Sequence, residues 1–380
     1  MSHVAMLIPG LDRVGGAEQQ VILLATGMRR RGWKVTVITL SGAGGRAADE
    51  FHAAGVAFLS LGMCKGLADP RGWIRFHRWL KQQAPDVVHA HLPHAAWLAR
   101  WSRLVAPVPV LVDTLHSSYT GTLGRRLGYR WSNWLPDLVT AVSQAVADAH
   151  LSASMVTQEK LTVLPNGVDV EVWRPDATVR IAIRRELGLE KEFLWFAAGR
   201  LEPVKDYPTL LLAFARTLDD SRLVIAGSGP LQGELTRLTA TLKLENRVRF
   251  LGFEQNVRRW MQAADGFVLS SRWEGLPMSL LEAAACALPT VATDVPGTRE
   301  VIADGHTGWL VPGCDSTALG EAMNRMTQTP PEKRDAMGQK ARRQVIERYS
   351  LGAVLDQWEA LYQNLLNRTG TFRTGGNAAS

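Results

Sequence analysis

Residues 270–294 read SSRWEGLPMSLLEAAACALPTVATD, and this stretch decides the fold that we expect for the whole chain. A short apolar run at 266–269 precedes it, a second lies at 288–292, and between them are a Gly-Pro turn and an apolar helical segment. The order strand, loop, helix, strand is typical of a parallel α/β sheet. Glu274 lies in the turn and Glu282 in the helical segment, with seven residues between them. Ligands of open α/β sheets bind at the carboxyl ends of the strands, so we expect a binding site here.

The same alternation of strand and helix patterns fills the rest of the chain. With 380 residues, 46% of them hydrophobic, the chain is long enough to bury two cores. We therefore expect an α/β protein with two doubly wound, Rossmann-like domains. The other strand patterns lie at 4–9, 34–40, 56–60, 86–89, 108–112 and 138–142, and then at 193–198, 222–226, 248–251 and 265–269.

A turn-rich segment at 165–169 predicts where the first domain ends. We expect an N-terminal domain at 1–170 and a C-terminal domain at 171–350, joined by polar sequence at 171–191. A helix is expected at 351–366, and the polar tail 367–380 has the composition of a disordered segment.

Composition predicts a cytoplasmic protein. No window approaches the roughly 20 apolar residues that a membrane span requires, and the N-terminus shows no signal-peptide pattern. Cys64, Cys286 and Cys314 are too few and too scattered for a disulfide framework or a zinc site, which fits a reducing compartment.

The net charge of +7 belongs to the first half of the chain. Residues 1–165 hold 17 Lys and Arg against 10 Asp and Glu, whereas the remainder is balanced. A basic half of this kind is typical of a protein that binds anionic lipid, a phosphate-bearing acceptor or nucleic acid. It is equally typical of a protein whose surface is basic without such a partner. We expect no nucleic-acid partner, because no module pattern for one is present.

Gly15 and Gly16 stand before a helical segment in the first loop of the chain. Backbone N–H groups and the helix dipole favour a phosphate at such a position. The spacing is not that of the G-x-G-x-x-G motif, which counts against a dehydrogenase, and an ordinary tight turn explains the glycines equally well.

Histidines follow two of the predicted strands. His89, His91 and His94 resemble a metal-ligand cluster, but no carboxylate or cysteine stands nearby, and we predict no metal site there. His116 lies in the loop that follows the strand pattern at 108–112, where its ring could donate a hydrogen bond to a substrate.

The segment 119–134 interleaves three arginines with Tyr, Trp and Leu. This pattern suits a surface that touches a membrane interface or a long acceptor. A helix that buries its aromatic side chains and solvates its arginines explains it equally well. The arginines of this acceptor-side hypothesis are Arg125, Arg126 and Arg130.

Arg200 and Lys205 lie in one loop after the strand at 193–198. Two cations this close are suited to clamp a diphosphate, although pairing with Glu202 and Asp206 in the same loop is the plain alternative. Gly229 belongs to a Gly-Ser-Gly-Pro turn after the next strand, where backbone can also approach a ligand.

Taken in order, these motifs resemble family-4 glycosyltransferases of the GT-B architecture. The matching residues are Gly15-Gly16-Ala17-Glu18, His116, 165–169 (PNGVD), Gly199-Arg200-Leu201 with Lys205, and Glu274 with Glu282. The resemblance implies two Rossmann-like domains facing a central cleft, with the last helix crossing back to the first domain. It implies a retaining, metal-independent hexosyltransferase that uses a nucleotide-sugar donor, since no DxD-type cluster is present.

The resemblance also implies a role for each residue. Arg200 and Lys205 would neutralise the β-phosphate with the Gly16 N–H group, Glu282 would hold the ribose hydroxyls, and Glu274 and His116 would face the donor sugar or phosphate. Diphosphate is a stable leaving group, so charge stabilisation matters more than a general acid. The remaining donor contacts implied are Gly15, Gly199, Gly229, Phe253, Gly275, Leu276, Met278 and Ser279.

The turn after Glu274 departs from the family pattern. Many members read Glu-Gly-Phe-Gly-Leu-Pro, whereas this chain reads Glu-Gly-Leu-Pro-Met-Ser. The ribose contact is unaffected by this change, but the donor stays open among UDP-glucose, UDP-galactose, UDP-N-acetylhexosamines and GDP-mannose, with a UDP-sugar favoured by frequency in the family.

The leading hypothesis is therefore transfer of a hexose or N-acetylhexosamine to a lipid-linked or cell-envelope acceptor, at the inner face of the membrane. The alternatives are a GDP-mannose-dependent mannosyltransferase, a sugar-nucleotide epimerase on the same scaffold, and a carbohydrate-binding protein with a vestigial site. The spacing of the two glutamates and the basic first half count against the epimerase.

Overall fold

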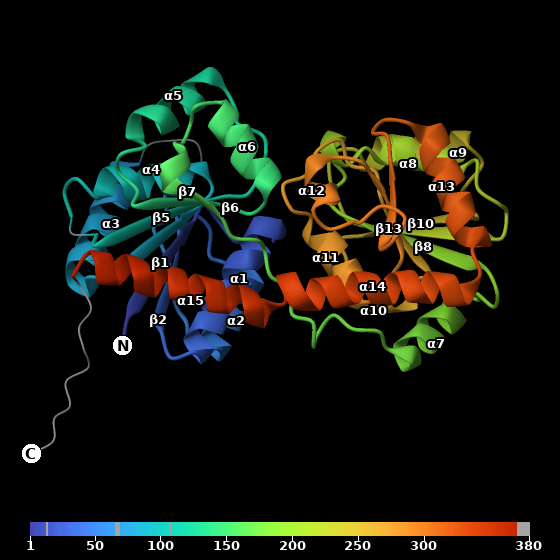
Figure 1. The fold of residues 1–380 in the computed structure, drawn as a ribbon, viewed down its shortest axis with the longest axis horizontal. Coiled ribbons are helices and arrows are strands. Elements are labelled where there is room, and N and C mark those ends of the chain that lie inside the picture. Colours follow the sequence, from blue (N-terminus) through green and yellow to red (C-terminus); the bar gives the residue numbers. More distant parts are fainter. Residues whose placement is uncertain (13, 65–68, 107, 371–380) are drawn as a thin grey trace, which may run out of the picture. The chain divides into compact units, whose positions relative to one another are not determined.

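The computed structural model describes residues 1–12, 14–64, 69–106 and 108–370. They form two compact units: unit 1 is Met1–Gly167 with Leu351–Ser380, and unit 2 is Val168–Ser350 (Figure 1). The last helix of the chain thus belongs to unit 1. It runs to Arg368, so the first residues of the predicted disordered tail are helical, and 371–380 lie outside the described residues.

Unit 1 contains a seven-stranded sheet in the order β3-β2-β1-β4-β5-β6-β7. Every pairing is parallel, and the order reverses between β1 and β4, which is a doubly wound topology. Strands covered on both faces are mostly apolar, and every residue of β1 and β5 is buried, Asp113 and Thr114 of β5 included. The strands are β1 (His3–Ile8), β2 (Lys34–Thr39), β3 (Ala57–Ser60), β4 (Val87–His91), β5 (Val110–Leu115), β6 (Leu138–Ala141) and β7 (Leu161–Val163).

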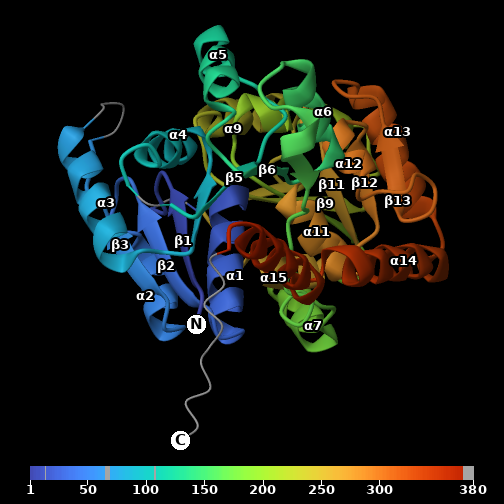
Figure 2. The same cartoon turned by 60° about the vertical axis from the view of Figure 1, so that its left-hand side comes forward.

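Helices cover this sheet, and α15 joins them from the far end of the sequence (Figure 2). Its apolar face completes the core, with Trp358 and Tyr362 both buried. Close packing on α1 requires Gly27, because a Cβ atom there would lie 2.5 Å from Leu355 Cδ1. The helices are α1 (Gly16–Arg30), α2 (Gly45–Ala53), α3 (Pro70–Gln83), α4 (Pro93–Ser102), α5 (Leu123–Ser132), α6 (Gln144–Ser152) and α15 (Leu351–Arg368), with a 3-10 turn η1 (Gln158–Lys160).

Unit 2 repeats the topology with six parallel strands in the order β10-β9-β8-β11-β12-β13. The order reverses between β8 and β11. The two doubly wound, Rossmann-like domains expected from the sequence are therefore confirmed. The strands are β8 (Phe193–Ala198), β9 (Ser221–Ala226), β10 (Val248–Gly252), β11 (Gly266–Leu269), β12 (Thr290–Thr293) and β13 (Gly308–Val311).

The helices of unit 2 lie on both faces of its sheet (Figure 1). The fit of α14 against the segment after α11 depends on Gly338, because a Cβ atom there would lie 1.9 Å from the Ala287 carbonyl oxygen. The helices are α7 (Ala177–Glu186), α8 (Tyr207–Phe214), α9 (Gln232–Thr241), α10 (Val257–Ala263), α11 (Met278–Ala285), α12 (Pro296–Arg299), α13 (Ser316–Gln328) and α14 (Pro331–Tyr349), with a 3-10 turn η2 (Pro203–Lys205).

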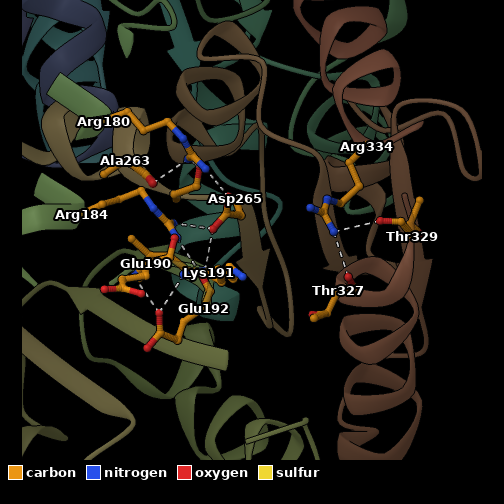
Figure 3. Close-up of polar contacts among 12 residues, drawn as sticks. Arg180, Arg184, Glu190, Lys191, Glu192, Ala263, Asp265, Thr327, Thr329 and Arg334 are labelled. Carbon is orange, nitrogen blue, oxygen red and sulfur yellow. Dashed lines mark hydrogen bonds and ion pairs between the residues drawn. The ribbon is translucent and has the colours of Figure 1, made fainter. Parts of the chain in front are cut away.

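The polar sequence at 171–191 is not a simple linker, because α7 within it is fastened to the sheet of unit 2 (Figure 3). Arg180 donates to the carbonyl oxygens of Ala263 and Ala264 at 2.8 and 2.7 Å and pairs with Asp265. Arg184 reaches the same carboxylate at 2.8 Å. Asp265 in turn accepts from the N–H group of Leu194, the second residue of β8, so one carboxylate joins the helix to the strand.

Every strand expected from the sequence is present, most of them with limits that differ by one or two residues, and two strands extend clearly further than expected. β4 continues to His91 and β5 to Leu115, so residues placed in loops by the sequence patterns are buried inside strands. The short strands β7 and β13 were not predicted. Among the described residues, no helix is apolar over enough of its length to cross a membrane.

Candidate functional site

The loops that follow β8 and β11 bring the predicted site residues of unit 2 together. These two strands are neighbours at the point where the strand order reverses. The loops at their carboxyl ends therefore lie side by side at one edge of the sheet, where ligands of such folds bind. Lys205 Nζ lies 2.5 Å from Glu274 Oε1 across the two loops. Both side chains are mostly buried, and the Ser271 hydroxyl donates to the same Glu274 oxygen at 2.6 Å.

Backbone and side-chain hydrogen bonds fix the two loops against each other. The Ser270 hydroxyl donates to the Lys205 carbonyl at 2.8 Å, and the Arg272 N–H group donates to Val204 at the same distance. The Arg272 guanidinium also pairs with buried Asp206 at 3.3 Å, which raises the pKa of Arg272. The loops therefore hold Lys205 and Glu274 in a defined geometry without a ligand.

Glycines allow the neighbouring loop after β9 to lie directly on the loop after β8. A Cβ atom at Gly227 would lie 1.9 Å from the Gly199 carbonyl oxygen, and one at Gly229 would lie 2.4 Å from that of Leu201. The Leu201 N–H group donates to the Ser228 carbonyl at 3.0 Å. Gly199 and Gly229, both predicted from the sequence, thus belong to two loops in direct backbone contact, and a side chain at Gly229 would clash with the backbone of Leu201.

Glu282 lies on α11, the helix that follows the turn of Glu274 in the connection between β11 and β12. Its side chain is half-buried, and within the described residues its carboxylate has no hydrogen bond or ion pair. Burial raises its pKa to about 8. The Cys286 thiol, one helical turn on, is buried and its pKa is raised to about 12 by burial and by the charge of Glu282. Glu282 is therefore an acceptor held in apolar surroundings.

The turn from Gly275 to Ser279 leads from Glu274 into α11. Leu276 and Met278 are buried, and Ser279 is half-buried in the first turn of the helix. The turn rests on α12, where a Cβ atom at Gly297 would lie 2.5 Å from the Gly275 carbonyl oxygen. The shortened glycine turn seen in the sequence is thus a closely packed segment.

Two predicted donor contacts of unit 2 lie apart from this cluster. Arg200 is 71% exposed and pairs with Glu202 at 3.1 Å, which is the local pairing that the sequence left open. Phe253 is 72% exposed and follows β10, whose last residue Gly252 accepts from the Gly227 N–H group at 2.8 Å. Arg200 and Phe253 therefore reach solvent from loops whose backbones adjoin the glycine pair.

In unit 1, Gly15 and Gly16 open α1 as predicted. The Gly15 N–H group donates to the Glu18 carboxylate at 3.0 Å, so a side chain of the helix itself caps one of the free donors. Gly16 is exposed as the first residue of α1. An anion at this end would meet the Gly16 N–H group and the positive end of the helix dipole.

His116 lies at the end of β5 in contact with His91. His116 Nε2 and His91 Nδ1 are 3.0 Å apart, and burial lowers the pKa of His116 to about 4 and that of His91 well below its usual value. Both rings are therefore neutral at pH 7, one donating and the other accepting. Neither His116 Nδ1 nor His91 Nε2 has a partner within the described residues.

His89 and His91 both lie in β4, with His91 as its last residue, and their hydrogen bonds go to residues other than His94. His89 bonds the Thr114 hydroxyl and the Tyr362 hydroxyl of α15, both at 2.6 Å. No three His, Cys, Asp or Glu side chains in the described part of the chain are placed to share a metal ion. Sequence reasoning missed the contact between His91 and His116, although the i, i+2 spacing in a strand already puts His89 and His91 on one face.

The arginines of the acceptor-side hypothesis all lie on α5. Arg126 and Arg130 are exposed and Arg125 is half-buried. The inner face of α5 is held by Arg100 of α4, which donates to the Ser132 hydroxyl at 2.7 Å and lies 4.5 Å above the Tyr129 ring. Arg100 also forms a fully buried pair with Asp113 of β5 at 2.6 Å.

Two family models match the chain and divide it much as the two units do. "Glycosyltransferase Family 4" matches residues 14–172, and "Glycosyl transferases group 1" matches residues 179–344. Phosphatidyl-myo-inositol mannosyltransferase of Mycobacterium leprae (strain TN) is 30% identical, with 96% of this chain and 97% of that protein covered. The chain belongs to glycosyltransferase family 4.

Further relatives support this membership and the resemblance drawn from the motifs. N-acetyl-alpha-D-glucosaminyl L-malate synthase of Bacillus anthracis is 30% identical over 74% of this glycosyltransferase and 75% of that protein. UDP-Gal:alpha-D-GlcNAc-diphosphoundecaprenol alpha-1,3-galactosyltransferase of Escherichia coli is 26% identical, covering 82% and 84%.

Solved structures show the same fold. Anabaena HepE, crystallised in complex with UDP-glucose, has a TM-score of 0.86 at 23% identity, with 96% of this glycosyltransferase and all of that chain covered. The sucrose-phosphate synthase of Thermosynechococcus elongatus has a TM-score of 0.84 at 20% identity, covering 97% and 100%. At these identities the likeness concerns the GT-B fold of two Rossmann-like domains.

Proposed function

We propose that this glycosyltransferase moves a hexose or N-acetylhexosamine from a UDP-sugar to a lipid-linked or cell-envelope glycan acceptor, with retention of anomeric configuration and without a divalent metal. The observation that carries the proposal is the arrangement at the carboxyl edge of the sheet of unit 2. Neighbouring elements there carry three charged side chains: the mostly buried cation Lys205, the hydrogen-bonded carboxylate Glu274 and the half-buried carboxylate Glu282.

The chemistry of sugar transfer calls for these groups. Breaking the bond between the anomeric carbon and a diphosphate places negative charge on the leaving group, and fixed cations and N–H donors stabilise that charge. Lys205 is held in place by Glu274 at 2.5 Å, and Arg200 on the same loop is exposed and would exchange its surface pair with Glu202 for an anion. In the proposed reaction both cations neutralise the diphosphate, which is the basis for omitting a metal.

Glu282 is proposed to hold the ribose. A carboxylate with two oxygens accepts from both hydroxyls of a 1,2-diol, and charge-assisted hydrogen bonds of this kind are about twice as strong as neutral ones. The raised pKa of about 8 indicates surroundings poor in water and in cations, where such donors are most needed.

His116 of unit 1 is proposed to contact a substrate hydroxyl or phosphate. Its ring is neutral, and its contact with His91 fixes which nitrogen remains available. A neutral imidazole offers a donor or an acceptor without adding charge. Gly16, at the exposed start of α1, is proposed to donate its N–H group to an anion.

The choice of donor and acceptor rests on the relatives. The related Escherichia coli protein is named for UDP-galactose and a diphosphoundecaprenol-linked acceptor, and the Mycobacterium leprae protein is named for phosphatidyl-myo-inositol. Lipid-linked acceptors thus recur among them, while the sugars differ. The turn at 275–279 is where we expect the sugar to be selected, because it follows Glu274 directly and enters α11.

Isothermal titration calorimetry with UDP, GDP and ADP tests the donor site. The wild type is expected to bind UDP most tightly, Glu282→Ala to lose most of the affinity, and Glu321→Ala, an exposed carboxylate on α13, to bind like the wild type. Absence of binding by the wild type for all three nucleotides refutes the proposal. Slow hydrolysis over a panel of nucleotide sugars then identifies the sugar without any acceptor.

Two further measurements address the finer parts of the reaction. The coupling constant of the anomeric proton in the product is expected to match that of the donor, and an inverted product overturns retention. Transfer is expected to survive treatment with a chelator, and a loss that added Mg²⁺ or Mn²⁺ restores overturns metal independence.

A further inference from the structure

The helix α5 of unit 1 carries its large apolar side chains on the outside. Leu123, Leu127 and Trp131 of the helix, and Trp134 just beyond it, are between 45 and 77% exposed. Leu123, Leu127 and Trp131 are spaced with Arg126 and Arg130 three and four residues apart, so these five side chains form one helical face, and Trp134 continues the spacing beyond the end of the helix. We call this set, Leu123, Arg126, Leu127, Arg130, Trp131 and Trp134, the outer face of α5.

The packing explains why this face is not needed for the core. The opposite side of α5 is held by polar contacts: Arg100 donates to Ser132 Oγ and to the Tyr129 carbonyl and lies above the Tyr129 ring. Gly128 lets Trp97 of α4 approach, since a Cβ atom there would lie 2.9 Å from the Trp97 ring. The helix is therefore fixed from beneath, and its leucines and tryptophans remain in solvent.

More exposed apolar side chains lie at the end of α4. Trp101, Leu104 and Val105 are between 47 and 60% exposed. Arg103 donates to the Leu135 carbonyl at 2.6 Å, which holds the end of α4 against the segment that follows α5. In both ribbon views α5 lies on the outside of unit 1 with α4 beside it (Figures 1 and 2). Exposed large apolar side chains gathered on neighbouring helices are typical of an interaction site.

Charge identifies the partner. The sequence has no carboxylate between Asp113 and Asp137, and these two are paired with Arg100 and Arg103. The outer face of α5 therefore combines two cations, Arg126 and Arg130, with leucine and tryptophan. This is the composition of helices that lie in the interface of an anionic bilayer. A second copy of the chain would bring Arg126 and Arg130 against the same arginines, which opposes self-association.

We propose that the outer face of α5, together with the end of α4, docks unit 1 onto the surface of a membrane that contains anionic lipid. The tryptophans enter the interfacial region and the arginines contact the headgroups. This inference extends the proposed function by naming where an enzyme with a lipid-linked acceptor meets the membrane. Binding to vesicles needs neither donor nor acceptor, so the two proposals fail separately.

Co-sedimentation with phosphatidylcholine vesicles, with and without phosphatidylglycerol, tests the proposal at low and high salt. The wild type is expected to bind the anionic vesicles, less strongly as salt screens the arginines. Trp131→Ser with Trp134→Ser should abolish binding at both salt concentrations. Arg126→Ala with Arg130→Ala should weaken binding to anionic vesicles about 30-fold, at about 1 kcal/mol per arginine, and remove the salt dependence.

A matched control lies on unit 2, where Ile181 and Arg185 of α7 are also exposed. Ile181→Ser with Arg185→Ala removes an apolar side chain and a cation elsewhere and should leave vesicle binding unchanged. Circular dichroism and UDP affinity should be unaltered in the tryptophan variant, which shows that it is folded.

Three results overturn the proposal: a wild type indifferent to anionic lipid, a control variant that loses as much binding as the α5 variants, or a wild-type dimer in sedimentation velocity that the tryptophan substitutions dissociate. A wild type that binds vesicles but no nucleotide supports the docking surface and refutes the proposed function instead.

Discussion

With Glu282 holding the ribose as proposed, nucleotide binding should depend on pH, and substituting Glu282 should remove its part of that dependence. Its pKa of about 8 in the unliganded protein means that most molecules carry a protonated Glu282 at pH 7. Ribose hydroxyls donate to a carboxylate, so the ionised form is the one that binds best. Binding must therefore lower this pKa and release a proton at neutral pH.

The size of the effect follows from the pKa. Each unit of pH below it costs about 1.4 kcal/mol, or tenfold, if only the ionised form binds. The affinity for UDP should thus rise about tenfold from pH 6 to 7, about fivefold from 7 to 8, and little above 9. Glu282→Gln keeps the shape but loses the charge, so its affinity should be about 30-fold lower at high pH, the loss of about 2 kcal/mol typical of a hydrogen bond to a charged group.

Calorimetry in two buffers with different ionisation enthalpies measures the released proton directly. The β-phosphate of UDP titrates near pH 6 and adds its own slope, but that slope remains in Glu282→Gln, so the difference between the two proteins isolates the carboxyl group. Glu321→Gln on α13 serves as the control and should behave like the wild type. An equal pH dependence in wild type and Glu282→Gln would refute the reasoning.

Three other substitutions test the site and its support. Lys205→Met should slow sugar transfer about a hundredfold or more by removing a cation from the leaving group, while uridine, which lacks phosphate, binds as before in a competition assay. His91→Asn should lower kcat about tenfold or more with KM little changed, because His116 loses its orienting contact at 3.0 Å. The control is His94→Asn at an exposed position, which should leave both constants unaltered. Gly338→Ala should destabilise unit 2 by about 2 kcal/mol in urea unfolding. Gly233→Ala on α9 should instead stabilise it by up to about 1 kcal/mol, because no atom lies closer than 3.9 Å to its Cβ position. Equal effects of the two substitutions would contradict the packing argument.

Most strands could be predicted from the sequence because parallel strands covered on both faces are mostly apolar. Such strands are visible as short hydrophobic runs whatever their neighbours are, and β1 and β8 are fully buried examples. The strands it missed, β7 and β13, are three and four residues long, and several of their residues are only half-buried. A run that short gives no periodic signal against the loops around it.

The segment 171–191 was misread as a linker for a related reason. Hydrophobic periodicity reports helices that bury an apolar face, but α7 is attached chiefly through charge. Arg180 and Arg184 look solvated in the sequence, and only the fold places Asp265 between them (Figure 3). The same limit applies to Arg100, whose partner Asp113 stands thirteen residues later on another element.

The site was predictable as a list of residues but not as a set of contacts. Loops after strands carry the ligands of α/β folds, so Lys205 and Glu274 could both be named from the sequence. Their pairing depends on β8 and β11 being neighbours, although β9 and β10 separate them along the chain. The sequence instead offered Glu202 and Asp206 as partners for the cations, and the structure gives Glu202 to Arg200 and Asp206 to Arg272.

This redistribution of partners changes the expected role of Glu274. In the unliganded protein the Lys205–Glu274 pair is neutral and is also bonded by the Ser271 hydroxyl. A diphosphate brings more charge than one carboxylate and competes for Lys205, so its arrival would weaken the pair and expose a Glu274 oxygen beside the sugar. In the proposed reaction the carboxylate holds the cation in place before the donor binds and would become an acceptor for the donor afterwards. Its value is then preorganisation, because a cation fixed in advance needs no rearrangement when charge develops on the leaving group.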